Sequence, residues 1–171
     1  MSIKLTDKQM QTILDLARKL VNKRTEVYEH AVEVYEKNHP ATSRLSKKIA
    51  EGEVNNLLIA RPTIPKPHEF KSQAEYQRYV KDLRNQLRYG VERAEQKAIY
   101  NYIGAVRKAW GNESANIIES VAQQNPSKFI DLVNSGKLPS IRFLYKITDE
   151  EAQDDYIDTL ITEMDEEDNE E

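Results

Sequence analysis

The sequence predicts an all-α protein, and three observations lead to this prediction. Apolar residues recur at steps of three and four, as on one face of an amphipathic helix, and strict alternation is scarce. Gly occurs only five times in 171 residues, whereas Lys, Glu, Gln, Asn and Ala are abundant. No proline interrupts the longest periodic stretch. We expect a long central helix over about residues 72–110, with an N-terminal helical unit before it and a small acidic helical bundle after it.

The proline-rich segment at residues 61–67 is the clearest boundary in the chain. Pro62, Pro65 and Pro67 forbid a helix and favour extended geometry. We therefore expect four regions. They are an N-terminal helical region at 1–60, a linker with a basic intermediate helix at 61–110, an acidic helical domain at 111–164 and a disordered acidic tail at 165–171.

The N-terminal region begins with a capping box, in which Thr6 precedes Gln9 by three residues. Helical periodicity then predicts a long helix from about Asp7 to Lys37. A short helix is expected over 43–51. Residues 54–60 are apolar and suit either a helical turn or a buried extended strand.

The central helix begins with a second capping box, formed by Ser72 and Glu75. We expect a bend or break near Gly90, because glycine weakens a helix interior. The apolar face of this helix consists of Tyr76, Val80, Leu83, Leu87, Val91, Ala94, Ala98, Tyr102, Val106 and Trp110.

Shorter helices follow. We expect one over about 112–124 and another over 126–134, the latter with Pro126 at its first position. An irregular segment comes next. Thr148 and Glu151 then form a capping box that leads into the last helix.

The net charge of −4 hides a strong asymmetry along the chain. Residues 1–60 carry a net charge of +2, residues 61–109 carry +6 and residues 110–171 carry −12. A basic middle and an acidic end point to two different partners, or to one partner with two faces. An ordinary solvated surface followed by a disordered acidic tail is the alternative interpretation.

The basic middle carries a stripe of cations at helical spacing, interleaved with tyrosines. Such a pattern suits contacts with nucleic acid phosphates or with an acidic protein surface, whereas tyrosines at helical spacing more often line a core. The cations that we expect to contact a polymerase or DNA are Arg78, Lys81, Arg84, Arg88 and Arg93.

Several classes of function lack a signature in this sequence. There is no cysteine, and His30, His39 and His68 lack the spacing of a zinc site. No phosphate-binding glycine loop, calcium loop or catalytic triad is recognisable. We therefore expect no catalytic residues and no bound metal or cofactor. We also expect no membrane association, because no apolar run reaches the roughly 20 residues of a membrane span.

Two regions of the chain, one central and one C-terminal, resemble parts of the terminal proteins of small tailed phages with protein-primed linear genomes. Residues 70–79 and 83–93 are similar to the intermediate domain of that family, with a proline-containing lead-in and a basic, tyrosine-rich helix. Residues 125–132, the Phe143-Leu144-Tyr145 sequence and residues 156–161 are similar to its priming domain. The resemblance covers about residues 61–162, and it consists of patterns without a catalytic motif.

This resemblance implies that the chain primes viral DNA replication and stays covalently attached to the DNA. Such a protein is a substrate and not an enzyme, because a viral DNA polymerase joins the first nucleotide to one of its hydroxyl groups. The dNTP and the divalent metal belong to the polymerase reaction. The implied partners are that polymerase and the 5′ ends of linear viral DNA, and the implied locations are the host cytoplasm at the nucleoid and the virion.

Four residues are candidates for the priming hydroxyl. Tyr145 matches the family pattern best, because it follows a Phe and precedes the acidic run. Ser140 is the second candidate, followed by Thr148, which also suits a helix cap, and Ser135. A Tyr145 ring packed with its neighbours in a small core is the structural alternative.

The chain departs from the family in being short and in having an N-terminal part that is barely basic, so DNA binding by residues 1–53 is open. A different class of function also fits the composition. The chain would then be a helical phage assembly or scaffolding protein that associates through the apolar face at 76–110, or an acidic DNA mimic that blocks a nucleic-acid enzyme.

Overall fold

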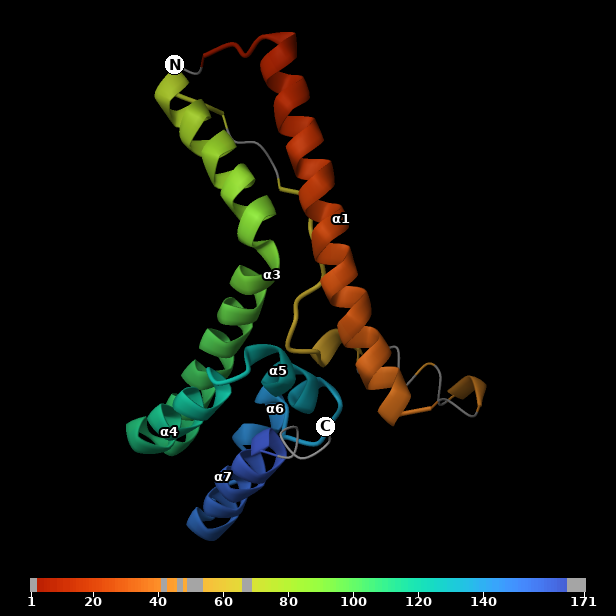
Figure 1. Cartoon of the computed structure of the whole chain (residues 1–171), viewed down its shortest axis with the longest axis vertical. Helices are drawn as coiled ribbons and strands as arrows, with labels where there is room; N and C mark the ends of the chain where they lie inside the picture. Colours follow the sequence, from red (N-terminus) through yellow and green to blue (C-terminus); the bar gives the residue numbers. More distant parts are fainter. Residues whose placement is uncertain (1–2, 41–42, 46–47, 49–53, 66–68, 166–171) are drawn as a thin grey trace. The chain divides into compact units, whose positions relative to one another are not determined.

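The computed structural model describes residues 3–40, 43–45, 48, 54–65 and 69–165, which form helices and connecting segments without any strand (Figure 1). This confirms the predicted all-α class. The helices are α1 (Asp7–Asn38), α3 (Gln73–Trp110), α4 (Asn112–Ala122), α5 (Pro126–Asn134), α6 (Ile141–Leu144) and α7 (Glu150–Asp165), with a 3-10 turn, η1, at Val54–Asn56.

The two long helices follow the sequence prediction closely. At the start of α1, the Thr6 and Gln9 side chains each accept a hydrogen bond from the other residue's backbone N–H, at 3.2 and 3.0 Å. At the start of α3, Ser72 Oγ accepts from the Glu75 N–H at 3.2 Å, as expected. The expected bend is at Tyr89, whose φ of −117° and ψ of 18° are not helical.

The chain divides into two compact units that differ from the predicted linear regions. Unit 1 comprises residues 1–29 and 61–94, and unit 2 comprises residues 30–60 and 95–171. Both long helices pass from one unit into the other. One change of unit falls between Ala60 and Arg61, at the start of the proline-rich segment, and the described residues 61–65 belong to unit 1.

Unit 1 contains a parallel pair of helices. Residues 61–72, which we call the return connection, lead back to the start of α3. Hydrogen bonds link Gln9 to Gln73, and Arg24 to Gln86, so the N-terminal halves of α1 and α3 run in the same direction. The core near the N-terminal end of the pair contains Ile13, Phe70, Tyr76 and Val80, with Ile3, Leu5, Leu16 and Tyr79 packed against it.

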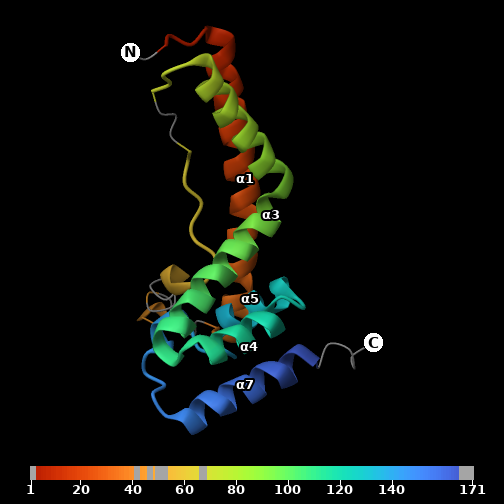
Figure 2. The same ribbon diagram turned by 90° about the vertical axis from the view of Figure 1, so that its left-hand side faces the viewer.

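The described part of the return connection lies along one side of this helix pair (Figure 2). At one end, the Arg61 guanidinium lies over the Tyr28 ring, 5.9 Å from its centroid. At the other end, the Phe70 and Tyr79 rings pack edge to face, with their centroids 5.4 Å apart. The backbone carbonyl of Phe70 accepts a hydrogen bond from the Ile3 N–H. These contacts hold residues Arg61 and Phe70 against the helices of unit 1.

Unit 2 is a helical bundle with a filled aromatic and aliphatic core. The C-terminal half of α3 contributes Tyr102, Ile103 and Val106, all at most 2% exposed. The Tyr102 and Phe129 rings pack edge to face at 5.1 Å, which joins α3 to α5. Helices α4 and α7 pack against each other, with Ile118 fully buried.

Some local predictions need correction. The last helix is capped by Asp149, whose carboxylate accepts from the Glu151 N–H at 3.2 Å, and not by Thr148. Residues 54–56 form a 3-10 turn, which settles the choice between turn and strand. Most of the short helix expected at 43–51 and nearly all of the tail at 165–171 lie outside the described residues. No helix in the described ranges is long and apolar enough to span a membrane.

Candidate functional site

The segment from Ser140 to Thr148 forms a tight turn that contains the short helix α6. The Phe143 N–H donates to the Ser140 carbonyl at 2.9 Å, and the Lys146 N–H donates to the Phe143 carbonyl at 3.0 Å. Tyr145 is the residue that ends α6, with φ −71° and ψ −15°. Its position is therefore set by a hydrogen-bonded turn and not by a long irregular loop.

Two aromatic donors, the buried Tyr102 and the half-buried Trp110, anchor the turn to the core of unit 2. The Tyr102 hydroxyl donates to the Pro139 carbonyl at 2.8 Å, just before the turn. The Trp110 indole N–H donates to the Leu144 carbonyl at 3.1 Å, just before Tyr145. The Leu144 side chain is itself fully buried.

The Tyr156 hydroxyl completes this network. It lies 2.8 Å from the Tyr102 hydroxyl, and it is the donor because the Tyr102 proton points to Pro139. Burial raises the pKa of both tyrosine hydroxyls well above the ordinary value, so both stay neutral. Neither hydroxyl is accessible to react with a partner.

The four candidate hydroxyls have different environments. Ser135 is 7% exposed, and its Oγ donates to the Leu132 carbonyl at 3.1 Å, which makes it a structural hydroxyl. Ser140 is half-buried at the start of α6, and its side chain makes no capping hydrogen bond there. Thr148 is exposed. Tyr145 is 52% exposed, so its ring is not packed in a small core as the structural alternative supposed.

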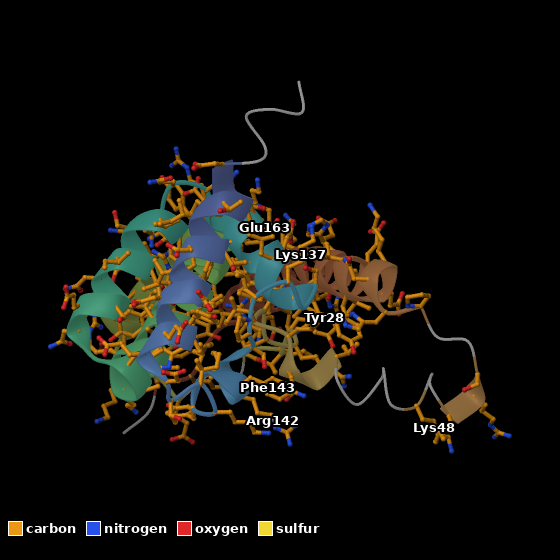
Figure 3. All side chains as sticks on the ribbon, turned by 90° about the horizontal axis from the view of Figure 1, so that it is seen from below. Tyr28, Lys48, Lys137, Arg142, Phe143 and Glu163 are labelled. Carbon is orange, nitrogen blue, oxygen red and sulfur yellow. The ribbon has the colours of Figure 1, made fainter. Side chains whose placement is uncertain are left out.

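Cations and a second aromatic ring surround Tyr145 in the sequence and share its exposure. Phe143 is 47% exposed, and the Lys146 ammonium lies over its ring, 4.9 Å from the centroid. Arg142 is also exposed, and Figure 3 shows Arg142 and Phe143 projecting outward from the turn. The turn therefore presents an aromatic and basic surface in a unit that is otherwise acidic.

Helix α7 directly follows this turn and presents an acidic face. Its other face buries Tyr156, Leu160 and Met164. The helix contains no Lys or Arg, and its last turn ends in an acid where the helix dipole favours a cation. Six exposed carboxylates form no ion pair within the described part of the chain, namely those of Glu150, Glu151, Asp154, Asp155, Asp158 and Asp165.

All five cations that the sequence predicts as partner contacts are exposed, but one of them forms an ion pair within the chain. Arg78, Lys81, Arg84 and Arg88 are all exposed on α3 in unit 1. Arg93 is exposed too, but it pairs with Asp82 at 3.6 Å. A straight helix separates residues eleven positions apart by about 16 Å. The two members of this pair lie on either side of the bend at Tyr89.

Sequence reasoning missed the residues that hold the turn. Tyr102 and Trp110 were placed on the apolar face of the central helix, which is right for their rings. Their polar atoms, however, reach carbonyls of residues more than thirty positions away. A Tyr or Trp at a core position usually needs a hydrogen-bond partner, and this was the only signal available.

Among the described residues, no three His, Asp or Glu side chains are grouped closely enough to hold a metal ion. The chain matches no known family model, no curated protein and no solved structure.

Proposed function

We propose that this chain is a protein primer for DNA synthesis, with the Tyr145 hydroxyl as the primer group. In the reaction, the Tyr145 oxygen attacks the α-phosphorus of a dNTP bound to a DNA polymerase. A tyrosyl phosphodiester forms, pyrophosphate leaves, and the hydroxyl proton is lost to the polymerase site or to water. The chain supplies the hydroxyl and its position, and the polymerase supplies the catalytic groups.

The observation that carries this proposal is the contrast between Tyr145 and the other hydroxyls near it. The Tyr145 ring is 52% exposed on a turn that hydrogen bonds from Tyr102 and Trp110 fix at Pro139 and Leu144. A nucleophile must be both accessible and well positioned to react efficiently. Ser135 fails the first condition because its Oγ is buried and hydrogen-bonded.

The acidic face of α7 supports the same proposal. A polymerase binds its primer duplex in a channel lined by Lys and Arg. A helix with unpaired carboxylates, such as those of Asp154, Asp155 and Asp158, complements that channel electrostatically. Because the carboxylates are exposed, salt should screen this association, and binding to the polymerase should weaken as ionic strength rises.

The acidic face also favours a second candidate, a DNA mimic that occupies a basic channel without any nucleotide attachment. The scaffold alternative has less support. The apolar face of α3 on which it rested is mostly buried within the chain, including Tyr76, Leu83 and Tyr102, and Val91 is its clearest exposed member at 43%.

The experiment is a labelling reaction with the DNA polymerase encoded in the same genome, a labelled dNTP and a divalent metal. We expect covalent label on the wild-type chain and none on Tyr145→Phe, because only the phenolic oxygen is removed. Tyr100→Phe is the matched control, since Tyr100 is a tyrosine of the same unit that is 78% exposed and lies outside the turn.

The outcomes separate the candidates. Label lost only in Tyr145→Phe supports the proposal. Label retained in that variant contradicts Tyr145, and Ser140→Ala and Thr148→Ala then identify the hydroxyl in use. A wild-type chain that binds the polymerase without label, while the polymerase extends an ordinary primer, supports the mimic.

A further inference from the structure

Unit 1 has the register of a parallel two-stranded coiled coil. Each α1 residue that is hydrogen-bonded to α3 has a partner whose residue number is higher by 62 to 67. This difference is similar at the two ends of the seam, at Gln9 and at Lys23 and Arg24, as expected for parallel helices in constant register. Seam positions also alternate in steps of four and three along both helices, as in heptad repeats. The seam consists of Ile13, Ala17, Leu20, Arg24 and Val27 of α1 and of Tyr76, Val80, Leu83, Leu87 and Gly90 of α3.

A pair of helices has two long grooves, one on each side of the seam. Tyr28 of α1 and Tyr79 of α3 flank the first groove, and the return connection contacts both through Arg61 and Phe70. We call this the covered groove. The other, which we call the open groove, is flanked on α1 by the positions of Lys19 and Lys23 and on α3 by those of Lys81, Arg84 and Arg88.

Charge is distributed unequally between the two grooves. The open groove has five cations and one acid, Glu26, at its flanking positions 9–26 and 74–91. The covered groove has the cations Arg18 and Arg93 against the acids Asp7, Glu75 and Asp82. The five cations of the open groove are all exposed, and only Lys23 has a hydrogen bond across it, to the Leu87 carbonyl.

The five cations also alternate between the two helices. Seam positions of α3 lie opposite seam positions of α1 whose residue numbers are lower by 63. With this alignment, the order of the cations along the helix axis is Lys81, Lys19, Arg84, Lys23 and Arg88. At about 1.5 Å per residue they occupy about 10 Å of the helix axis. A groove with cations on both walls over this length matches a linear polyanion better than a compact anion.

We propose that the open groove of unit 1 binds the phosphate backbone of nucleic acid. This inference does not depend on the priming function, because it concerns another unit and a different chemistry. DNA carries one negative charge per about 1.7 Å of duplex axis, so about three phosphates of one strand lie within 10 Å. Contacts with phosphates carry no sequence information, so we expect this binding to be independent of base sequence.

The experiment measures binding of the full chain to a mixed-sequence duplex oligonucleotide and to one of its single strands, over a range of salt concentrations. For about three phosphate contacts, we expect a log–log slope near −2.7 for duplex, equivalent to about a forty-fold loss of affinity between 50 and 200 mM salt. A free strand that fits the groove equally well should give a slope near −2.

The test variant is Lys81→Gln with Arg84→Gln, and the matched control is Lys8→Gln with Arg18→Gln. Both pairs remove two exposed positive charges, and Gln suits a helix about as well as Lys or Arg. Only the first pair lies in the open groove. We expect the test variant to lose at least about tenfold in affinity at low salt and to reduce the slope by about 2, with the control close to wild type.

Equal losses in both variants would overturn the proposal, because they indicate attraction to net charge alone. Absence of nucleic acid binding by the wild-type chain would also overturn it. If the test variant instead loses affinity only for the polymerase, the groove binds an acidic protein surface. Wild-type labelling of Tyr145 without any nucleic acid binding would reject this groove and leave the priming function intact.

Discussion

The two units bury their apolar residues in different ways. Unit 1 has fourteen Lys and Arg against eight Asp and Glu, and a thin seam of mostly aliphatic side chains between two helices. Unit 2 has eleven Lys and Arg against twenty-one Asp and Glu, and its core is built around Tyr102, Phe129 and Tyr156. The difference indicates that unit 1 displays charge along a simple scaffold, whereas unit 2 uses a filled core to hold one short turn.

The largest expected effect is on the core of unit 2. Phe129→Ala removes a fully buried ring and should lower the free energy of unfolding by about 3–5 kcal/mol. Denaturant unfolding followed by the fluorescence of Trp110, the single Trp, measures this. Phe143→Ala is the control, since its ring is 47% exposed and should cost less than about 1 kcal/mol. Equal costs would contradict this description of the core.

The same change made in each unit tests the difference between them. Tyr102→Phe removes a buried hydroxyl that bonds both Pro139 and Tyr156, and should cost about 1–3 kcal/mol. Tyr76→Phe in unit 1 removes a hydroxyl whose bond to the Gln9 carbonyl is 3.4 Å long, and should cost about 0.5 kcal/mol. Unfolding curves for the two variants measure both values. A larger loss for Tyr76→Phe would reverse the comparison.

Two glycines of unit 2 should respond to alanine with opposite signs. Gly136 has φ +85°, and an added Cβ would lie 3.2 Å from the His39 ring, so Gly136→Ala should destabilise by about 1–2 kcal/mol. Gly104 lies inside α3 with open space around it, so Gly104→Ala should stabilise by about 0.5–1 kcal/mol. Thermal unfolding of both variants checks the signs, and two shifts in the same direction would contradict this prediction.

The smallest expected effect is a pH dependence that belongs to unit 2. Burial raises the pKa of Tyr156, so the folded chain keeps this proton when the unfolded chain loses it. The stability contribution is therefore present below pH about 10 and declines above it, by about 0.8 kcal/mol at half a pH unit higher. Because burial raises the pKa of Tyr102 as well, Tyr156→Phe should reduce this alkaline decline in unfolding free energy without removing it. An unchanged decline would show that Tyr156 does not cause it.

The sequence predicted the elements well because they depend on local patterns. The capping pairs at Thr6 and Ser72, the extent of α3 and its bend all follow from spacing within a few residues. The two units were not predictable in this way. The proline-rich segment does mark the change of unit between Ala60 and Arg61, but only contacts such as that of Arg61 with Tyr28 assign the residues that follow to unit 1.

The candidate sites show the same limit. Tyr145 was selected from a family pattern, and its exposure depends on where Leu144 and Pro139 are anchored, which is decided by donors far away in the chain. The cations of α3 were visible as a stripe. That Lys19 and Lys23 of α1 lie in one groove with these cations follows only from the parallel register of the two helices.

The most direct test of the priming proposal is to locate the nucleotide on the wild-type chain. After reaction with the polymerase and dNTP, the protein is digested and its peptides are mapped by mass spectrometry. We predict one added nucleotide on the peptide that contains Tyr145, on its phenolic oxygen, with a bond that withstands the mild alkali that cleaves seryl and threonyl linkages. A nucleotide on any other residue, or an unmodified chain in the presence of an active polymerase, would contradict the proposal.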